Sequence, residues 1–239
     1  PFETGLVRKQ GWAAQLDVSP RGSSIERFDL APLTWTSVVE PVADSPLDPE
    51  QARWRQRAES ALMGHAHGPS ATAAGASWLI SPPIDVSPQA DFSLYFEARH
   101  QFEADTQHAY DGGVIEVSLD NGQTWLDAST LASLSPAYNG EISDCCDNPG
   151  SGRPAYTGRS GEDTNVYVAH RLQFARALEG QRVQLRFGVL SDAAVAADGW
   201  HIDHVRLDNA VNAPFAEIIP NRPACSAGYL FSDRFESIY

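Results

Sequence analysis

The chain has 239 residues, of which 42% are hydrophobic and 10% aromatic, as in an ordinary globular protein and unlike a disordered one. Asp and Glu (31 residues) outnumber Lys and Arg (17 residues), and the formal net charge of −14 repels nucleic acid and anionic membranes. No run of about 18 apolar residues occurs, so the sequence predicts no membrane-spanning helix. We therefore expect neither a nucleic-acid partner nor membrane insertion.

Most of the chain reads as short strands bounded by Gly, Pro, Asn or Asp. The predicted strands are, in chain order, Leu33–Glu40, Ser77–Ser81, Phe92–Arg99, Gly113–Leu119, Asn165–Leu172, Val183–Leu190 and Trp200–Leu207. Strict alternation places Val183, Leu185, Phe187 and Val189 on one face of their strand. The one helix candidate is Gln51–Met63, whose last four residues fit a strand equally well. The pattern predicts an all-β fold, a two-sheet antiparallel β-sandwich of the jelly-roll type with long loops.

The segment from Ser118 to Trp125 reads S-x-D-x-G-x-T-W and resembles the Asp-box hairpin. In that motif the Ser and Asp side chains bind the backbone of the turn, and the Trp packs beneath it. Asp120-Asn121-Gly122 supplies residues that tolerate the positive φ of a tight hairpin turn. A sialidase needs several such boxes around a propeller, so we interpret this single box as a structural hairpin.

Two long loops, at 99–112 and 127–164, are expected to be either functional or tied down. The second contains the adjacent Cys145 and Cys146, which pair poorly with each other. We predict that one of them, Cys146 in the favoured pairing, bonds to Cys225 and leaves one free thiol, which implies an oxidising compartment. The bond would pin a C-terminal tail, residues 212–239, onto a single domain at 1–211. The chain begins at Pro1, and we interpret it as a mature protein or an excised fragment.

A series of motifs follows a familiar order along the chain. The motifs are Phe2-Glu3-x-Gly5, Trp12, Ser77-Trp78-Leu79-Ile80-Ser81-Pro82, Asp111-Gly112-Gly113, Tyr138-Asn139-Gly140, Gly152-Arg153-Pro154-Ala155-Tyr156-x-Gly158 and Gly199-Trp200-x-Ile202-Asp203. Together they resemble the MAM-like jelly-roll modules appended to secreted bacterial proteases, including immune-inhibitor-A-type and fungalysin-type metalloproteases. The resemblance runs from the first motif to about residue 208.

The resemblance implies an extracellular, non-catalytic domain beside an enzyme, with a bound calcium ion. By position in the family, Glu3 and Asp203 would hold the ion, and His204 stands where family members often carry a second Asp. Asp208 could compensate, and Asp111 could be a further ligand, since calcium takes six to eight oxygen ligands. The alternative is that Glu3 caps a turn and the aspartates are solvated strand ends or turn formers.

Exposed aromatic side chains would favour a different function, the binding of glycans by stacking. The candidates in or beside the longer loops are Trp35, Trp54, Tyr110, Tyr138 and Tyr156. Most tryptophans are buried packing residues, which is the alternative for each of them.

Other residues could in principle carry chemistry. Paired acids for glycoside hydrolysis could be drawn from Glu97, Glu103, Asp105, Asp111 and Glu116, although such pairs arise by chance in so acidic a chain. Glu97 and Glu116 lie in alternating strands and are expected to face solvent or a groove. His65 and His67 form an H-A-H pair that could bind a transition metal, but the sequence places no third ligand. No G-x-S-x-G, H-E-x-x-H or nucleotide-binding motif occurs.

We therefore expect a secreted, calcium-stabilised, non-catalytic accessory domain of a bacterial protein, most simply attached to a protease. Its partners would be the neighbouring catalytic domain and an extracellular protein or glycan. A glycan-binding module is the second hypothesis, and a glycosidase-type hydrolase is the third.

Overall fold

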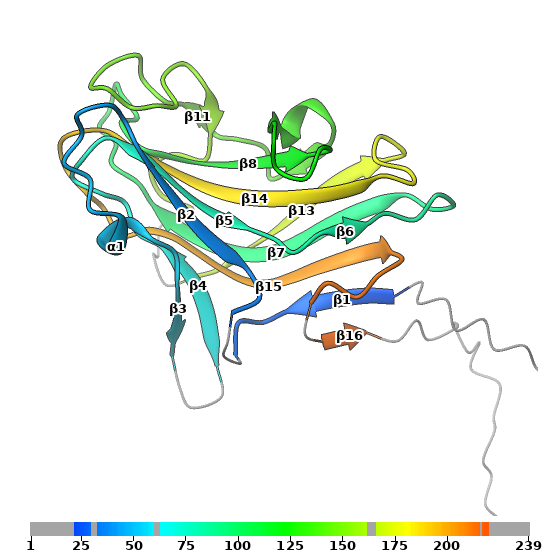
Figure 1. Ribbon diagram of the computed structural model, residues 1–239. Helices are drawn as coiled ribbons and strands as arrows, with labels where there is room; N and C mark the ends of the chain where they lie inside the picture. The colour runs from blue at the N-terminus through cyan, green and yellow to red at the C-terminus, as the bar shows by residue number, and fades with distance from the viewer. Residues whose placement is uncertain (1–21, 30–32, 60–62, 162–165, 216, 220–239) are drawn as a thin grey trace, which may run out of the picture.

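The computed structural model describes residues 22–29, 33–59, 63–161, 166–215 and 217–219 (Figure 1). Within these residues strands predominate, and two antiparallel sheets lie one above the other with a hydrophobic layer between them (Figure 1). The predicted two-sheet antiparallel β-sandwich is confirmed.

The larger sheet has eight strands. They are β1 (Gly22–Glu26), β3 (Arg55–Ala58), β4 (Gly64–Gly68), β7 (Phe92–Gln101), β10 (Ser133–Ser135), β13 (Val168–Ala175), β15 (Gly199–Ala210) and β16 (Glu217–Ile219). Their order is β10-β13-β7-β15-β1-β16, with β4 pairing with one end of β15 and β3 pairing with β4. The long strand β15 is the central strand of this sheet, because it pairs with β1, β4 and β7.

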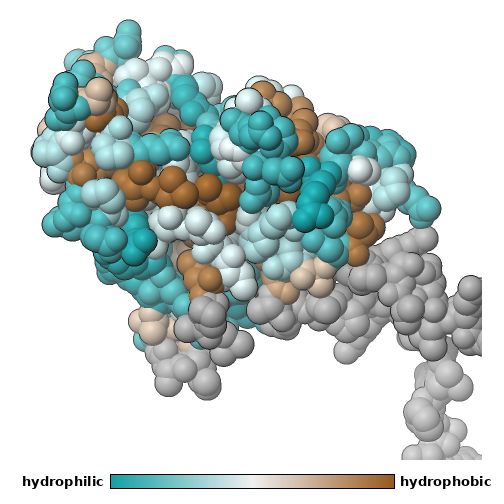
Figure 2. All heavy atoms as spheres, viewed as in Figure 1, coloured by the Kyte–Doolittle hydropathy of each residue, from teal (hydrophilic) through white to brown (hydrophobic). Residues whose placement is uncertain are grey.

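The smaller sheet has six strands. They are β2 (Thr36–Pro41), β5 (Gly75–Ile80), β6 (Ile84–Asp85), β8 (Gly112–Ser118), β9 (Leu126–Asp127) and β14 (Arg182–Ser191). Their order is β2-β5-β14-β8-β9, and β6 pairs with the start of β14. A separate pair, β11 (Gly140–Glu141) and β12 (Pro154–Ala155), lies in the long loop that the sequence singles out. Figure 2, which has the same viewpoint as Figure 1, shows a largely hydrophilic face with a hydrophobic band across it.

The helix predicted at Gln51–Met63 is wrong for residues 53–59, and residues 60–62 lie outside the described part of the chain. Among the described residues the helices are the short α1 (Pro49–Ala52), which strand β3 follows after two residues, and the short 3₁₀ helix η1 (Ala128–Thr130). Trp54 explains the difference, since its side chain is buried in the core and its indole N–H donates to the backbone oxygen of Ser77 at 3.0 Å. This tertiary contact overrides the helical propensity of the neighbouring residues. Neither helix of the described residues has the length or apolar character needed to cross a membrane.

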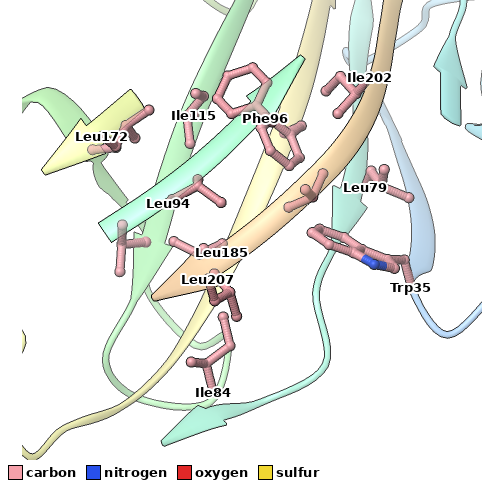
Figure 3. Close-up of a cluster of buried hydrophobic side chains, with 14 of the residues drawn as sticks. Trp35, Leu79, Ile84, Leu94, Phe96, Ile115, Leu172, Leu185, Ile202 and Leu207 are labelled. Atoms are coloured by element: carbon pink, nitrogen blue, oxygen red, sulfur yellow. The ribbon is translucent and has the colours of Figure 1, made fainter. Parts of the chain in front are cut away.

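The core lies between the two sheets, as the alternation within β14 predicts. Val183, Leu185, Phe187 and Val189 are all buried and pack in one cluster with inward side chains of β7 and β15. Figure 3 shows Leu94, Leu185 and Leu207 meeting between the layers. Burial of each such side chain contributes about 1.5–3 kcal/mol, so this contact area is what holds the two sheets together.

The first residues of the predicted C-terminal tail belong to the folded body. Phe215 is buried and stacks on Trp35 with a ring-centroid distance of 5.3 Å, and β16 pairs with β1. Residues 220–239 lie outside the described residues, so the docking of the rest of the tail stays a prediction.

The Asp-box hairpin forms as predicted. The hydroxyl of Ser118 accepts a hydrogen bond from the backbone N–H of Gly122 at 2.8 Å, and Asp120 accepts one from the N–H of Thr124 at 2.8 Å. Hydrogen bonds from Thr124 and Ser118 lower the pKa of Asp120 to about 2. Asn121 has a φ of 58° and Gly122 a φ of 83°, as the turn requires.

The outer face of the smaller sheet is organised around one cation. The guanidinium of Arg186 on β14 lies 3.5 Å from the ring centroid of Trp78 and 4.2 Å from that of Trp125. It also bonds to the buried carboxylate of Glu116, with 2.7 Å between Nε and Oε2. Gly188, two residues along, leaves space for the Trp78 ring, because a Cβ atom there would lie 2.1 Å from that ring.

We expect Gly188→Ala to destabilise the protein by about 1–3 kcal/mol, the usual cost of overpacking. Urea unfolding of the wild type and the variant measures this. The matched control is the same change in a Trp78→Leu background, where the cost should fall because the ring that the methyl group meets is gone. An equal cost in both backgrounds would contradict this account of the packing.

Candidate metal centre

The ends of strands β8 and β14 bring acidic residues together at one end of the sandwich. The last residue pair between β8 and β14 is Gly112 with Leu190. Asp111 and Asp192, which lie just beyond this pair, therefore come close to each other. The backbone N–H of Asp192 donates to Oδ1 of Asp111 at 2.9 Å. The ladder thus converts two positions far apart in sequence into neighbours.

Asp111 is the most deeply placed of these acids. Its residue exposure is 0%, and its Oδ2 accepts a hydrogen bond from the hydroxyl of Ser70 at 2.5 Å. Burial, together with the smaller effect of the nearby charges of Asp192 and Glu103, raises the pKa of Asp111 to about 7, against the lowering effect of its two hydrogen bonds. The free-energy cost of ionising this carboxyl is therefore high unless a positive charge is close.

Glu103 completes the group, which we call the carboxylate cluster: Glu103, Asp111 and Asp192. One carboxylate oxygen from each lies within 4.8 Å of the others. Backbone N–H groups of the β14–β15 loop orient two of the three: Ala194 donates to Asp192 at 2.8 Å and Val195 donates to Glu103 at 3.3 Å. Desolvation and the charge of Asp192 raise the pKa of Glu103. Three converging carboxylates make a hard, all-oxygen donor set of the kind that Ca²⁺ prefers.

The Asp111-Gly112-Gly113 motif has a packing reason in this structure. A Cβ atom on Gly113 would lie 2.8 Å from the Trp200 ring of the opposite sheet, and one on Gly112 would lie 2.9 Å from Ala155. The two glycines let both faces of β8 be covered closely, and this covering buries Asp111.

The structure separates Asp111 from the other predicted metal ligands. Asp203 on β15 bonds to the backbone N–H of His204 at 2.6 Å, and Asp208 bonds to Arg206 at 3.3 Å. Neither belongs to the carboxylate cluster. Glu3 lies outside the described residues, so a calcium site made of Glu3, Asp203 and Asp208 stays a prediction.

Three of the five predicted glycan-stacking aromatics are core residues instead. Trp35, Trp54 and Tyr156 are 4%, 2% and 2% exposed and pack in the cluster between the sheets. Their rings therefore offer no face to a sugar in solvent, and the prediction of an exposed platform is wrong for them. Trp35 and Trp54 directly precede strands β2 and β3, and Tyr156 forms a bridge with Gly113, so all three stand where their side chains enter the core.

Tyr110 and Tyr138 are half-buried and already engaged. The hydroxyl of Tyr110 donates to Asp105 at 2.9 Å, which raises the pKa of Tyr110 to about 12. The hydroxyl of Tyr138 accepts from the backbone N–H of Ile115 at 2.9 Å, and its ring lies edge-on to that of Tyr156. The five aromatics do not form one surface.

Of the acids considered for glycoside hydrolysis, Glu103 and Asp111 lie together in the carboxylate cluster, whereas Glu97 and Glu116 lie on different sheets. Glu97 is exposed, whereas Glu116 is 4% exposed and forms ion pairs with Arg153 at 2.7 Å and with Arg186 at 2.5 Å. The expectation that Glu116 faces solvent or a groove is wrong, because the outer face of its strand is covered by the long loop around Ile142 and Ala155.

The adjacent cysteines are not bonded to each other in the described part of the chain. Cys145 is half-buried and Cys146 is exposed, with a φ of 66°. A hydrogen bond between the thiol of Cys146 and Cys145 raises the pKa of Cys146 to about 11. Cys225 lies outside the described residues, so the bond between Cys146 and Cys225 stays a prediction.

The sequence does not single out two aspartates that the structure places beside predicted candidates, Asp192 beside Asp111 and Asp198 beside His67. Asp192 follows the predicted strand Val183–Leu190 after one residue, and the pairing of that strand with Gly113–Leu119 is the signal that would have placed it beside Asp111. Asp198 precedes the strand that carries His201, and only the pairing of β15 with β4 brings it to His67.

Comparison with known proteins gives one sequence relative. No model of a protein family matches the chain. Bacillopeptidase F of Bacillus subtilis (strain 168) is 26% identical over 131 residues, which cover 55% of this chain and 7% of that protein. The chain thus matches only a small part of the protease, and the resemblance to MAM-like modules stays an expectation.

Solved structures with related folds are distant. The K1 and K3 cleaved adhesin domains of Lys-gingipain from Porphyromonas gingivalis W83 are 12% and 13% identical, cover 77% of this chain and 96% and 97% of their own, and have TM-scores of 0.40. The C-terminal CBM6 of LamC from Zobellia galactanivorans is 14% identical, covers 72% of this chain and 99% of its own, and has a TM-score of 0.29.

A hollow of about 170 Å³ lies away from the carboxylate cluster. His100, Asn139, Tyr156 and His170 are among its lining residues. The His170 ring stacks on Phe96 at 4.6 Å, and within the described part of the chain neither of its nitrogens has a hydrogen-bond partner. Burial, with a smaller contribution from the neighbouring His100, lowers the pKa of His170 to about 4.

This depressed pKa predicts acid sensitivity. The folded pKa of about 4 lies below the ordinary value of 6.5, so the unfolded chain binds the extra proton first as the pH falls. The stability contribution is complete above pH 6.5 and is lost toward pH 4. We expect His170→Phe to flatten the fall in melting temperature over this range, measured by circular dichroism. Parallel pH profiles of melting temperature for wild type and variant would contradict the attribution of this acid sensitivity to His170.

Proposed function

We propose that this chain is a non-catalytic accessory domain of a secreted bacterial protease and that Ca²⁺ bound at the carboxylate cluster stabilises it. The observation that carries the accessory role is the match between 55% of this chain and 7% of Bacillopeptidase F. A segment that matches so small a share of a protease is what an appended domain would give.

The burial of Asp111 supports the calcium part of the proposal. An isolated buried carboxylate is costly, and here the neighbouring charges, Asp192 and Glu103, are of the same sign. A divalent cation would reverse this repulsion and allow all three carboxylates to stay ionised. Carboxylate, backbone carbonyl and water oxygens are the usual ligands of Ca²⁺, whereas the softer transition metals favour nitrogen and sulfur.

A cation at this position would join three loops. Glu103 and Asp111 come from the β7–β8 loop, Asp192 opens the β14–β15 loop, and Ser70 follows β4. These loops are contributed by both layers of the sandwich. Calcium would therefore act as a link between the two sheets at this end of the domain.

The placement of the other acids supports a non-catalytic role. Glu116 is neutralised by two arginines, and Asp105 is held by the hydroxyl of Tyr110 and by two backbone N–H groups. These interactions occupy the oxygens of both carboxylates. A glycosidase needs one protonated and one ionised carboxyl facing each other across a substrate.

We expect calcium to raise the melting temperature of the chelator-treated chain. At a calcium concentration about 100 times Kd, the stabilisation is about 2.7 kcal/mol, which corresponds to roughly 5–10 °C for a domain of this size. Differential scanning calorimetry with excess chelator or with added CaCl₂ measures the shift.

Asp111→Asn is the matched variant for this test, because it keeps the size of the side chain and removes its charge. It should lose most of the calcium-dependent shift, whereas Asp91→Asn, at an exposed position outside the cluster, should retain it. Equal melting temperatures of the wild-type chain in chelator and in calcium would refute the calcium proposal.

The accessory role has its own test in the gene. We expect the reading frame that encodes this chain to encode a protease catalytic domain as well, and deletion of the present segment to lower the yield or targeting of the secreted protease. Co-sedimentation of the chain with insoluble polysaccharides should leave it in the supernatant. Saturable binding to one polysaccharide would instead support the glycan-binding hypothesis.

A further inference from the structure

Three histidines meet on the outer face of the larger sheet, away from the core. His65 and His67 are alternate residues of β4, and the β4–β15 register pairs His67 with His201. Ala66 and Ile202 between them point into the core. The ring centroids of His67 and His201 are 4.3 Å apart, and those of His65 and His201 are 4.9 Å apart. The fold thus supplies the third histidine that the H-A-H pair lacks in the sequence.

Asp198, at the end of the β14–β15 loop, adds a carboxylate to this group. Its Oδ2 lies 2.7 Å from Nε2 of His201, and its backbone oxygen lies 2.8 Å from Nε2 of His67. Ligand atoms of His67, Asp198 and His201 all fall within 4.8 Å of one another. We call His65, His67, Asp198 and His201 the histidine cluster.

The cluster combines buried nitrogen donors with an open side. His65, His67 and His201 are 4%, 4% and 3% exposed, whereas the Asp198 side chain is 45% exposed. An ion could therefore enter past Asp198 and meet the two imidazoles behind it.

His65 and Glu59 extend the cluster in the manner of an outer shell. Nε2 of His65 lies 2.9 Å from Nδ1 of His201, and Nδ1 of His65 lies 3.1 Å from Oε1 of Glu59, although without the alignment of a hydrogen bond. Metal-bound imidazoles usually donate their second N–H to a group of this kind, which fixes the ring and raises its basicity.

Arg99 is the group that opposes a cation here. Its guanidinium lies 3.3 Å from Oδ2 of Asp198 and 3.2 Å from Nδ1 of His201. A bound ion would replace the Nε2 protons of His67 and His201 and would take Asp198 from Arg99. The occupied cluster would then have His201 donating from Nδ1 to His65.

We propose that His67, His201 and Asp198 form a binding site for a divalent transition-metal ion, with His65 and Glu59 as its outer shell. Two imidazole nitrogens and a carboxylate, with a fourth position open to water, are a donor set that suits Zn²⁺. Zinc would draw these ligand atoms, now within 4.8 Å of one another, to roughly 2.0–2.2 Å from itself. The site is separate from the carboxylate cluster, although Asp192 and Asp198 are the two ends of one loop.

Isothermal titration calorimetry of the chelator-treated chain with ZnCl₂ tests the proposal. Calcium is kept in excess throughout, so that a failure of zinc binding is distinguishable from a failure of the calcium proposal. We expect one zinc ion per chain that calcium does not displace. Asp198→Asn, at an exposed loop position, should weaken zinc binding at least about tenfold, and His201→Ala should abolish it.

His108→Ala is the matched control, because His108 is an exposed histidine outside the cluster, and it should leave zinc binding unchanged. Arg99→Gln keeps every ligand and removes the competing cation, so it should tighten zinc binding severalfold. Circular dichroism spectra confirm that each variant is folded. No zinc binding by the wild type, or equal zinc binding by wild type and Asp198→Asn, would overturn the proposal.

Discussion

The antiparallel ladder between β8 and β14 holds the hydrophobic core, the outer-face packing and the acidic end of the molecule in one register. Inward residues such as Leu185 and Phe187 fill the space between the sheets, while Arg186 faces outward between two tryptophans. The ladder also ends where Asp111 meets Asp192. A shift of one residue would exchange the two faces and separate these carboxylates, so the packing of the core fixes the geometry of the candidate site.

The β14–β15 loop, residues 192–198, connects the two clusters of potential metal ligands. Its first residue bonds to Asp111 through the backbone, and its last residue contacts His67 and His201. Both clusters contain carboxylates, but the potential ligands of the carboxylate cluster are all oxygens, whereas those of the histidine cluster include imidazole nitrogens. The proposed calcium and zinc sites would therefore differ in donor chemistry although one loop contributes to both.

Local pattern predicts the strands well, because alternation such as that of Val183–Val189 depends only on which face is buried. It fails at Gln51–Met63, where the burial of Trp54 decides the conformation, and at Trp35 and Tyr156, which lie beside loops in the sequence but inside the sandwich. Asp111 is predicted as a ligand, but its partners are not, because they become neighbours only through strand pairing. The H-A-H pair is incomplete in the sequence for the same reason. His201 lies 136 residues after His65 and becomes its neighbour only through the pairing of β15 with β4.

The central claim is that the buried Asp111 carboxyl belongs to a calcium site. Calorimetric titration of the chelator-treated wild-type chain with CaCl₂ measures this binding directly. The account predicts saturable binding of one calcium ion at this site and its loss in Asp111→Asn. Absence of calcium binding by the folded wild-type chain, or equal binding by the folded Asp111→Asn variant, would contradict it.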